Sequence, residues 1–181
     1  MKRTEIEHLL PGVFHRTLYA GGLLETLLEV MEVLHAPAED VLRELDSFFD
    51  PRRAPYRFVP YLAGWVDLDK LLSAGPVSEF SPASFPTGLG RLRELVATAA
   101  FLSKWRGTAK GLLTFLETAT GTQGFEIDEH VPGDDGQPRP FHLRVFAPQE
   151  TEPYIVLITK IIELEKPAYV TYELEFRAPG P

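Results

Sequence analysis

The fold is decided by residues 108–128, which read TAKGLLTFLETATGTQGFEID, because the spacing of the apolar residues changes inside this stretch. Up to Gly121 the apolar residues recur every three or four positions, which is typical of a helix packed on one side. In residues 125–128 (FEID) apolar and polar residues alternate, which is typical of a half-buried strand. A helix that leads directly into a strand predicts an α+β fold for this part of the chain.

The chain beyond this stretch continues as sheet and helix. Residues 141–145 alternate again after the polar loop 131–140, which indicates a two-stranded hairpin. A helix is expected from about Glu152 to Pro167, and a last strand over residues 170–176. The C-terminal lobe is therefore predicted to run helix, strand, strand, helix, strand, with its small sheet covered by helices.

The N-terminal half is predicted to be helical. Apolar residues repeat at helical spacing over 23–34, and Pro37 is expected to open a second helix at its first turn. That helix should end at Asp50, just before a proline, and a short third helix is expected over 55–64. Residues 73–88 lack both spacings and are rich in Pro, Gly and Ser, which predicts an extended connector.

These elements divide the chain into five expected parts. They are an N-terminal interaction arm (1–20), a helical lobe (21–72), the connector (73–88), an α+β lobe (89–176) and a C-terminal tail (177–181).

Composition excludes several classes of function. The 181 residues are 44% hydrophobic and 24% charged, which is ordinary for a folded protein. The absence of cysteine excludes disulfides, thiolate metal sites and a cysteine nucleophile. No apolar run has the length of a membrane helix or a signal peptide, so we expect synthesis in the cytosol and no membrane insertion. The net charge of −8 argues against general nucleic-acid binding.

The segment WRGTAKGL (105–112) joins two predicted helices through a very short turn. Gly107 suits the left-handed residue past a helix end, and Thr108 suits the next N-cap. A similar corner occurs in helix-turn-helix proteins, so a nucleic-acid-binding regulator is one alternative function. The second helix offers only Lys110 as a basic residue, and we therefore interpret the segment as a structural corner. The corner residues are Trp105, Gly107, Thr108 and Gly111.

Metal ligands are sparse in the sequence. His130 and His142 flank the hairpin loop, which also contains or adjoins three aspartates (Asp128, Asp134 and Asp135). Asp67 and Asp69 form a DxD pair of the kind that holds metal-bound phosphates in some transferases. Loop acids and histidines of this kind are usually solvated, so we expect no metal and no cofactor.

Catalytic patterns are absent as well. The chain has no GxSxG elbow and no GxxxxGK[ST] loop. The strand acids Glu126, Asp128, Glu173 and Glu175 alternate toward water, away from any cleft that would shift their pKa values for acid–base work. A small hydrolase dependent on Glu126 or Asp128 remains the other alternative, but we expect the chain not to be an enzyme.

Aromatic, proline and aliphatic residues in the arm, in the segment 55–61 and in the connector exceed what a small core needs. These residue types anchor protein interfaces, so we predict contact with partner proteins here. The predicted interface residues are Leu10, Pro11, Val13, Phe14, Tyr19, Tyr56, Phe58, Tyr61, Phe80 and Phe85.

Several segments, taken in order, resemble the phage tail protein I family, small baseplate-wedge proteins of contractile tails and extracellular contractile injection systems. The segments are LPGVFHR (10–16), FFDPRRAP (48–55), FVPYLAGWVD (58–67), TGLGR (87–91) leading to WRGTAKGL (105–112), and EKPAYV (165–170). Together they span roughly residues 10 to 176, and the injection-system branch looks closer because of RGTAKGL and DPRRAPYRF.

The resemblance implies a structural subunit without catalytic residues. Its expected partners are larger wedge proteins, the hub and spike, and the sheath, with several copies arranged in a ring. The expected final location is a phage tail or a contractile injection particle.

Overall fold

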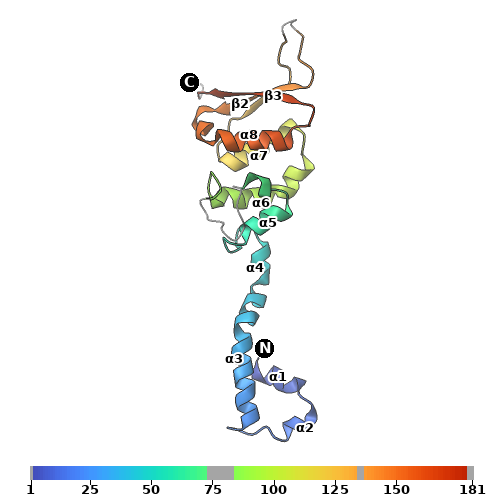
Figure 1. The fold of residues 1–181 in the computed structure, drawn as a ribbon, viewed down its shortest axis with the longest axis vertical. Helices are drawn as coiled ribbons and strands as arrows, with labels where there is room; N and C mark the ends of the chain where they lie inside the picture. The colour runs from blue at the N-terminus through green and yellow to red at the C-terminus, as the bar shows by residue number, and fades with distance from the viewer. Residues whose placement is uncertain (1, 73–83, 134–136, 179–181) are drawn as a thin grey trace. The chain divides into compact units, whose positions relative to one another are not determined.

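The computed structural model describes residues 2–72, 84–133 and 137–178 (Figure 1). The chain divides into two compact units, Met1–Phe48 and Phe49–Pro181, which we call unit 1 and unit 2. Most of the predicted connector lies outside the described residues. None of the described helices is both long and apolar enough to cross a membrane.

Unit 1 is built on one long helix, α3 (Leu23–Arg43), preceded by α1 (Arg3–Leu9) and α2 (Gly12–His15) and followed by α4 (Leu45–Phe49). α1 packs against α3, and Ile6 and Leu28 are buried there. The predicted interaction arm (1–20) thus contains two helices, and the first of these packs on α3.

Pro37 does not begin a helix, as the sequence predicted, but lies inside α3, which runs unbroken to Arg43. A proline removes one N–H donor and crowds the preceding turn, yet the hydrogen bonds on both sides of it remain. In a helix of 21 residues these bonds are sufficient to keep the backbone helical on both sides of Pro37.

Unit 2 contains the main hydrophobic core. Its helices are α5 (Val59–Trp65), α6 (Leu89–Lys104), α7 (Ala109–Thr120) and α8 (Ile155–Glu165), with 3-10 turns η1 (Asp69–Leu71) and η4 (Gln149–Tyr154). Val59, Leu62 and Ala63 of α5 share this core with α6, α7 and α8. The division of the chain thus differs from the one expected, because α5 packs with the C-terminal elements rather than with α3.

The described strands form a three-stranded sheet in the order β1 (Glu126–Asp128), β2 (His142–Pro148), β3 (Thr171–Arg177). β1 and β2 are antiparallel, as expected of the hairpin, whereas β3 is parallel to β2 after the crossover through α8. In Figure 1, α7 and α8 lie on one side of the sheet, with α6 and α5 behind them. The apolar residues of β2 and β3 join the helical core, and the predicted α+β class is confirmed.

The corner between α6 and α7 is closed by local contacts. Gly107 has a φ of +74°, and the hydroxyl of Thr108 accepts a hydrogen bond of 3.1 Å from the amide of Gly111. A Cβ atom on Gly111 would overlap the backbone carbonyl of Trp105, so only glycine permits this close approach.

Candidate interaction surfaces

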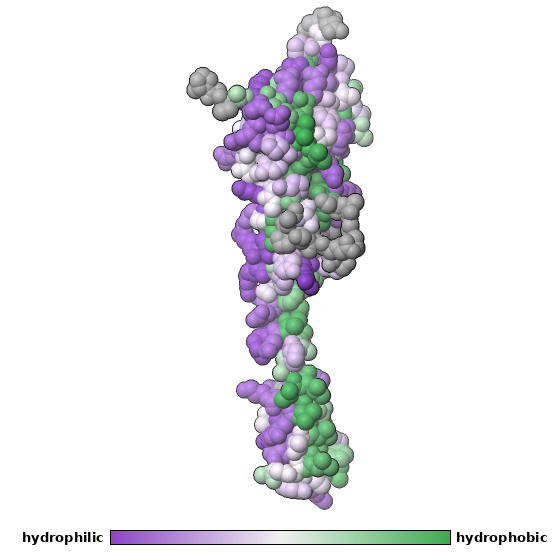
Figure 2. Space-filling view, turned by 60° about the vertical axis from the view of Figure 1, so that its left-hand side comes forward, coloured by the Kyte–Doolittle hydropathy of each residue, from purple (hydrophilic) through white to green (hydrophobic). Residues whose placement is uncertain are grey.

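α3 carries a row of exposed aliphatic side chains, which we call the α3 stripe. Its members are Leu23, Leu27, Val30, Val33, Leu34 and Val41. Leu23 is 88% exposed and Leu34 is 71% exposed, unusually high fractions for leucine in a folded unit. Figure 2 shows hydrophobic residues gathered along one side of unit 1 and hydrophilic residues along the other.

The opposite side of α3 is occupied by α1. Leu28 on that side is only 1% exposed. The guanidinium of Arg3 lies 2.6 Å from the carboxylate of Glu25 and 3.3 Å from that of Glu29, and the backbone N–H of Arg3 donates to Glu32. With 3.6 residues per turn, Glu25 and Glu32 point away from the α3 stripe, whereas Glu29 borders it beside Val30 and Val33.

The apolar residues of 23–34, which repeat at helical spacing, are divided by the structure between a buried and an exposed side. Leu28 turns inward, while Leu23, Leu27 and Leu34 face outward. The spacing of the apolar residues along the sequence already indicated this exposed row. Positions 23, 27, 30, 34 and 41 follow the alternation of four and three that is typical of helices packing in coiled coils.

The interface residues predicted in the N-terminal region lie mostly at the surface. Pro11, Val13, Phe14 and Tyr19 are exposed around α2, and Leu10 is half-buried. Their side chains are therefore available to a partner.

An aromatic cluster lies on unit 2 near α5. Phe58 is half-buried and contacts Tyr61, with ring centroids 5.7 Å apart, and Trp65, at 6.1 Å. Trp65 also stacks on Phe49 and is 65% exposed, although the sequence analysis did not select it. Tyr56, another predicted interface residue, is exposed and accepts a hydrogen bond from Arg57.

Two of the predicted interface residues, Phe80 and Phe85, come from the segment that was predicted to be a connector (73–88). Phe80 lies outside the described residues. Phe85 is 1% exposed and belongs to the core of unit 2, so its prediction as an interface residue is corrected. The Gly88 amide donates to the Phe85 carbonyl and closes a turn. The Thr87 hydroxyl donates to the carbonyl of Ala119 in α7, far away in the sequence, and this bond ties the turn to the core.

The acids considered for catalysis take part in surface ion pairs and a turn. Glu173 contacts Arg144 at 3.0 Å and Arg139 at 3.2 Å, and its hydrogen bond with Arg144 lowers the pKa of its carboxyl below the ordinary range. Glu175 also pairs with Arg144, and Glu126 with Arg177. The carboxylate of Asp128 accepts from the His130 amide in a local turn. These contacts stabilise the outer face of the sheet.

The proposed metal ligands do not converge among the described residues, where no group of three histidine or acidic side chains is placed to hold an ion. Asp134 and Asp135 lie outside the described part. Asp67 pairs with Lys70 at 2.8 Å and with Arg106 at 3.4 Å, and the hydrogen bond from Lys70 lowers its pKa. Its carboxylate is thus used in a salt bridge.

The basic residues near the corner are engaged within the chain. The ammonium of Lys110 lies 4.4 Å from the centroid of the Trp105 ring. Arg106 pairs with Asp67 and Glu165 and donates to the carbonyl of Leu164. Because these cations are paired or stacked, the corner offers little for phosphate contacts, and the geometry does not favour a DNA-reading helix.

Comparison with known families gives one finding that bears on these surfaces. A family model described as "Phage tail protein (Tail_P2_I)" matches residues 23–168 of the 181. The matched region includes the α3 stripe, the aromatic cluster and the corner. No curated protein sequence matches the chain.

Proposed function

The chain belongs to the phage tail protein (Tail_P2_I) family, and we propose that it is a structural baseplate-wedge subunit of a contractile tail or contractile injection system. A structural role in a phage tail and interaction with other tail proteins follow from the family. The wedge position and the injection-system variant are our proposal. In it, several copies surround the hub and spike and connect the baseplate to the sheath.

The observation that carries the proposal is the α3 stripe. Its six side chains are each between 49% and 88% exposed, and contiguous apolar patches of more than a few hundred Å² are rare on soluble monomers. Patches of this kind mark interaction sites, and the alternating spacing of four and three suits a helical partner. We infer that helices of neighbouring wedge subunits pack on the α3 stripe.

The remaining surfaces fit a subunit with more than one neighbour. The aromatic cluster of unit 2 offers rings of the kind that act as interface anchors. Residues around α2 add Val13, Phe14 and Tyr19. A wedge protein needs such separate contact surfaces, because each copy in a ring meets neighbours on different sides.

The test is to disrupt the α3 stripe without unfolding the chain. In Leu27→Asp/Leu34→Asp, two carboxylates replace exposed aliphatic groups, so the isolated protein should keep its circular dichroism spectrum. Co-expressed with the other tail genes, the variant should give at least about ten-fold fewer complete particles by sedimentation and negative-stain electron microscopy, since burying a charge without a partner is costly.

The matched control is His35→Asp, which adds a carboxylate to the same helix at an exposed position outside the stripe. This variant should assemble like the wild type. Normal particle yield from the double variant, with its fold intact, would refute the role of the α3 stripe.

A further inference from the structure

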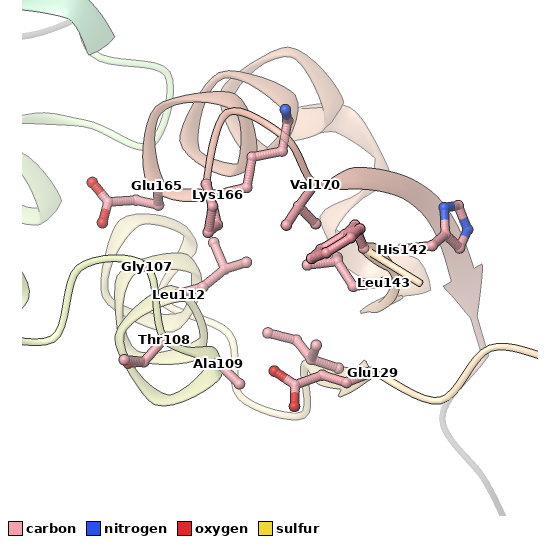
Figure 3. A pocket seen from close by; sticks show the side chains of 13 residues that line it. Gly107, Thr108, Ala109, Leu112, Glu129, His142, Leu143, Glu165, Lys166 and Val170 are labelled. Carbon is pink, nitrogen blue, oxygen red and sulfur yellow. The ribbon is translucent and has the colours of Figure 1, made fainter. Parts of the chain in front are cut away.

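A second feature, within unit 2, is a pocket between the start of α7, the strands β1 and β2, and the segment after α8 (Figure 3). Its volume is about 230 Å³. The side chains of Ala109, Leu112, Ile127, Leu143 and Val170 form the apolar part of its walls, and polar groups contribute almost as much of the lining. These residues come from four parts of the chain, so the pocket exists only in the folded unit.

The polar residues at this pocket leave one unpaired charge. Figure 3 shows the ends of the His142, Glu165 and Lys166 side chains directed away from the opening. Lys166 pairs with Glu163 at 3.2 Å, and Glu165 lies 3.6 Å from Arg106. Glu129, at the lower edge in Figure 3, makes no ion pair within the described part of the chain, so the rim carries an uncompensated negative charge.

Two exposed aromatic residues lie beside the pocket. Phe141, which lines it, and Tyr169 are 66% and 69% exposed and meet edge to face, with ring centroids 5.2 Å apart. Phe141 has a φ of +56°, a conformation that is unfavourable for a bulky residue. Such strain is concentrated at functional sites, and here it accompanies an aromatic side chain at the surface instead of in the core.

The size of the pocket limits its occupant. Pockets that bury drug-sized ligands measure roughly 300–1,000 Å³, more than is available here. A cavity of about 150 Å³ already admits benzene. The space therefore matches one aliphatic or aromatic side chain, and Glu129 adds a preference for a neighbouring cation.

We propose that this pocket binds an aliphatic side chain of a partner polypeptide that has arginine or lysine beside it. The apolar walls take the aliphatic group, Phe141 and Tyr169 cover the approaching backbone, and Glu129 pairs with the basic residue. This site is separate from the α3 stripe and does not depend on the wedge role.

The test uses the full chain labelled with ¹⁵N and the capped dipeptides Ac-Leu-Arg-NH₂, Ac-Leu-Glu-NH₂ and Ac-Ala-Arg-NH₂. Ac-Leu-Arg-NH₂ should shift the amide signals of Leu112 and Val170 saturably, with a dissociation constant on the order of 1–10 mM. Ac-Leu-Glu-NH₂ should bind at least about three-fold more weakly, because an exposed charge pair contributes modestly. Ac-Ala-Arg-NH₂ should give no saturable shift.

Two variants separate the apolar and ionic contributions. Ala109→Leu fills the pocket and should abolish the shifts, whereas Ala100→Leu, a matched change at an exposed position of α6, should leave them unchanged. Glu129→Gln should remove the difference between the Arg and Glu dipeptides. The proposal is overturned if Ac-Leu-Arg-NH₂ gives no saturable shift, if Ac-Ala-Arg-NH₂ binds equally well, or if Ala109→Leu binds like the wild type.

Discussion

Arg3 and Glu25 join α1 to α3 through a hydrogen-bonded ion pair in which guanidinium and carboxylate are 2.6 Å apart. The pair holds α1 on the face of α3 opposite the α3 stripe. One apolar face of α3 is thereby covered within the chain, and the α3 stripe on the other face stays exposed. α1, which lies in the predicted interaction arm, is therefore bound to α3 within the chain.

Arg3→Ala should loosen α1 without unfolding unit 2. Partly exposed ion pairs contribute about 0.2–1 kcal/mol, so amide hydrogen exchange over residues 3–9 should accelerate up to about five-fold. Arg43→Ala is the control, because its pair with Asp40 is fully at the surface within one helix. Equal exchange in the wild type and Arg3→Ala would show that the ion pair does not hold α1.

Gly111→Ala should destabilise unit 2, because the new methyl group would overlap the carbonyl of Trp105. Overpacking of this kind costs about 1–3 kcal/mol, although alanine is normally the better helix residue. Urea unfolding followed by tryptophan fluorescence measures the effect, since both tryptophans, Trp65 and Trp105, lie in unit 2.

Gly90→Ala is the matched control in α6, where a Cβ would meet no atom within 4 Å. It should stabilise unit 2 by about 0.5–1 kcal/mol. If both variants shift the urea midpoint in the same direction, the close approach at the corner is not what requires glycine.

The elements that the sequence predicted well are those determined by neighbouring residues. The helix ending at Gly121, the strand at Phe125 and the N-cap at Thr108 each depend on a few adjacent side chains. Leu143 and Val145 of β2 face the core, as their alternation with polar residues predicted.

The features that were missed depend on contacts distant in sequence. Whether Leu27 or Leu28 is buried is decided by where α1 docks, and Phe85 is buried because Thr87 bonds to α7. The pocket beside Leu112 combines four separate segments, so no local pattern marks it. The positive φ of Phe141 could not be predicted from the sequence either, because phenylalanine is not a residue type that indicates this conformation.

Two carboxyl groups of unit 2 should have pKa values that are shifted in opposite directions. The hydrogen bond from Arg144 lowers the pKa of Glu173, while burial raises the pKa of Glu165. The side-chain carboxyl of an isolated glutamate has a pKa of about 4.3. Carbon-detected NMR titration of the side-chain carboxyls should therefore place Glu173 below this value and Glu165 above it.

The sign of the effect on stability follows from the linkage between proton binding and folding. The contribution of Glu173 is present above its unfolded pKa and is lost as the pH falls through the lower folded pKa. That of Glu165 is complete below its unfolded pKa and is lost as the pH rises through the higher folded pKa. Glu173→Gln should thus weaken the pH dependence of the melting temperature on the acid side of the profile. Glu165→Gln should weaken it on the side toward neutral pH. Unchanged profiles in both variants would contradict these assignments.

Pro37→Ala should stabilise α3. Proline inside a helix is about 3 kcal/mol less favourable than alanine, and part of this cost is already relieved by the surrounding turns, so a gain of about 1–3 kcal/mol is expected. Amide exchange of residues 23–43 should slow by at least about five-fold. The opposite substitution, Ala38→Pro, places a second proline one position later and should accelerate exchange in the same helix. Pro37 lies on the side of α3 that bears the stripe, so a costly residue is kept at the surface assigned to a partner. If Pro37→Ala leaves exchange unchanged or faster, the proline is fully accommodated and no stability is given up at this surface.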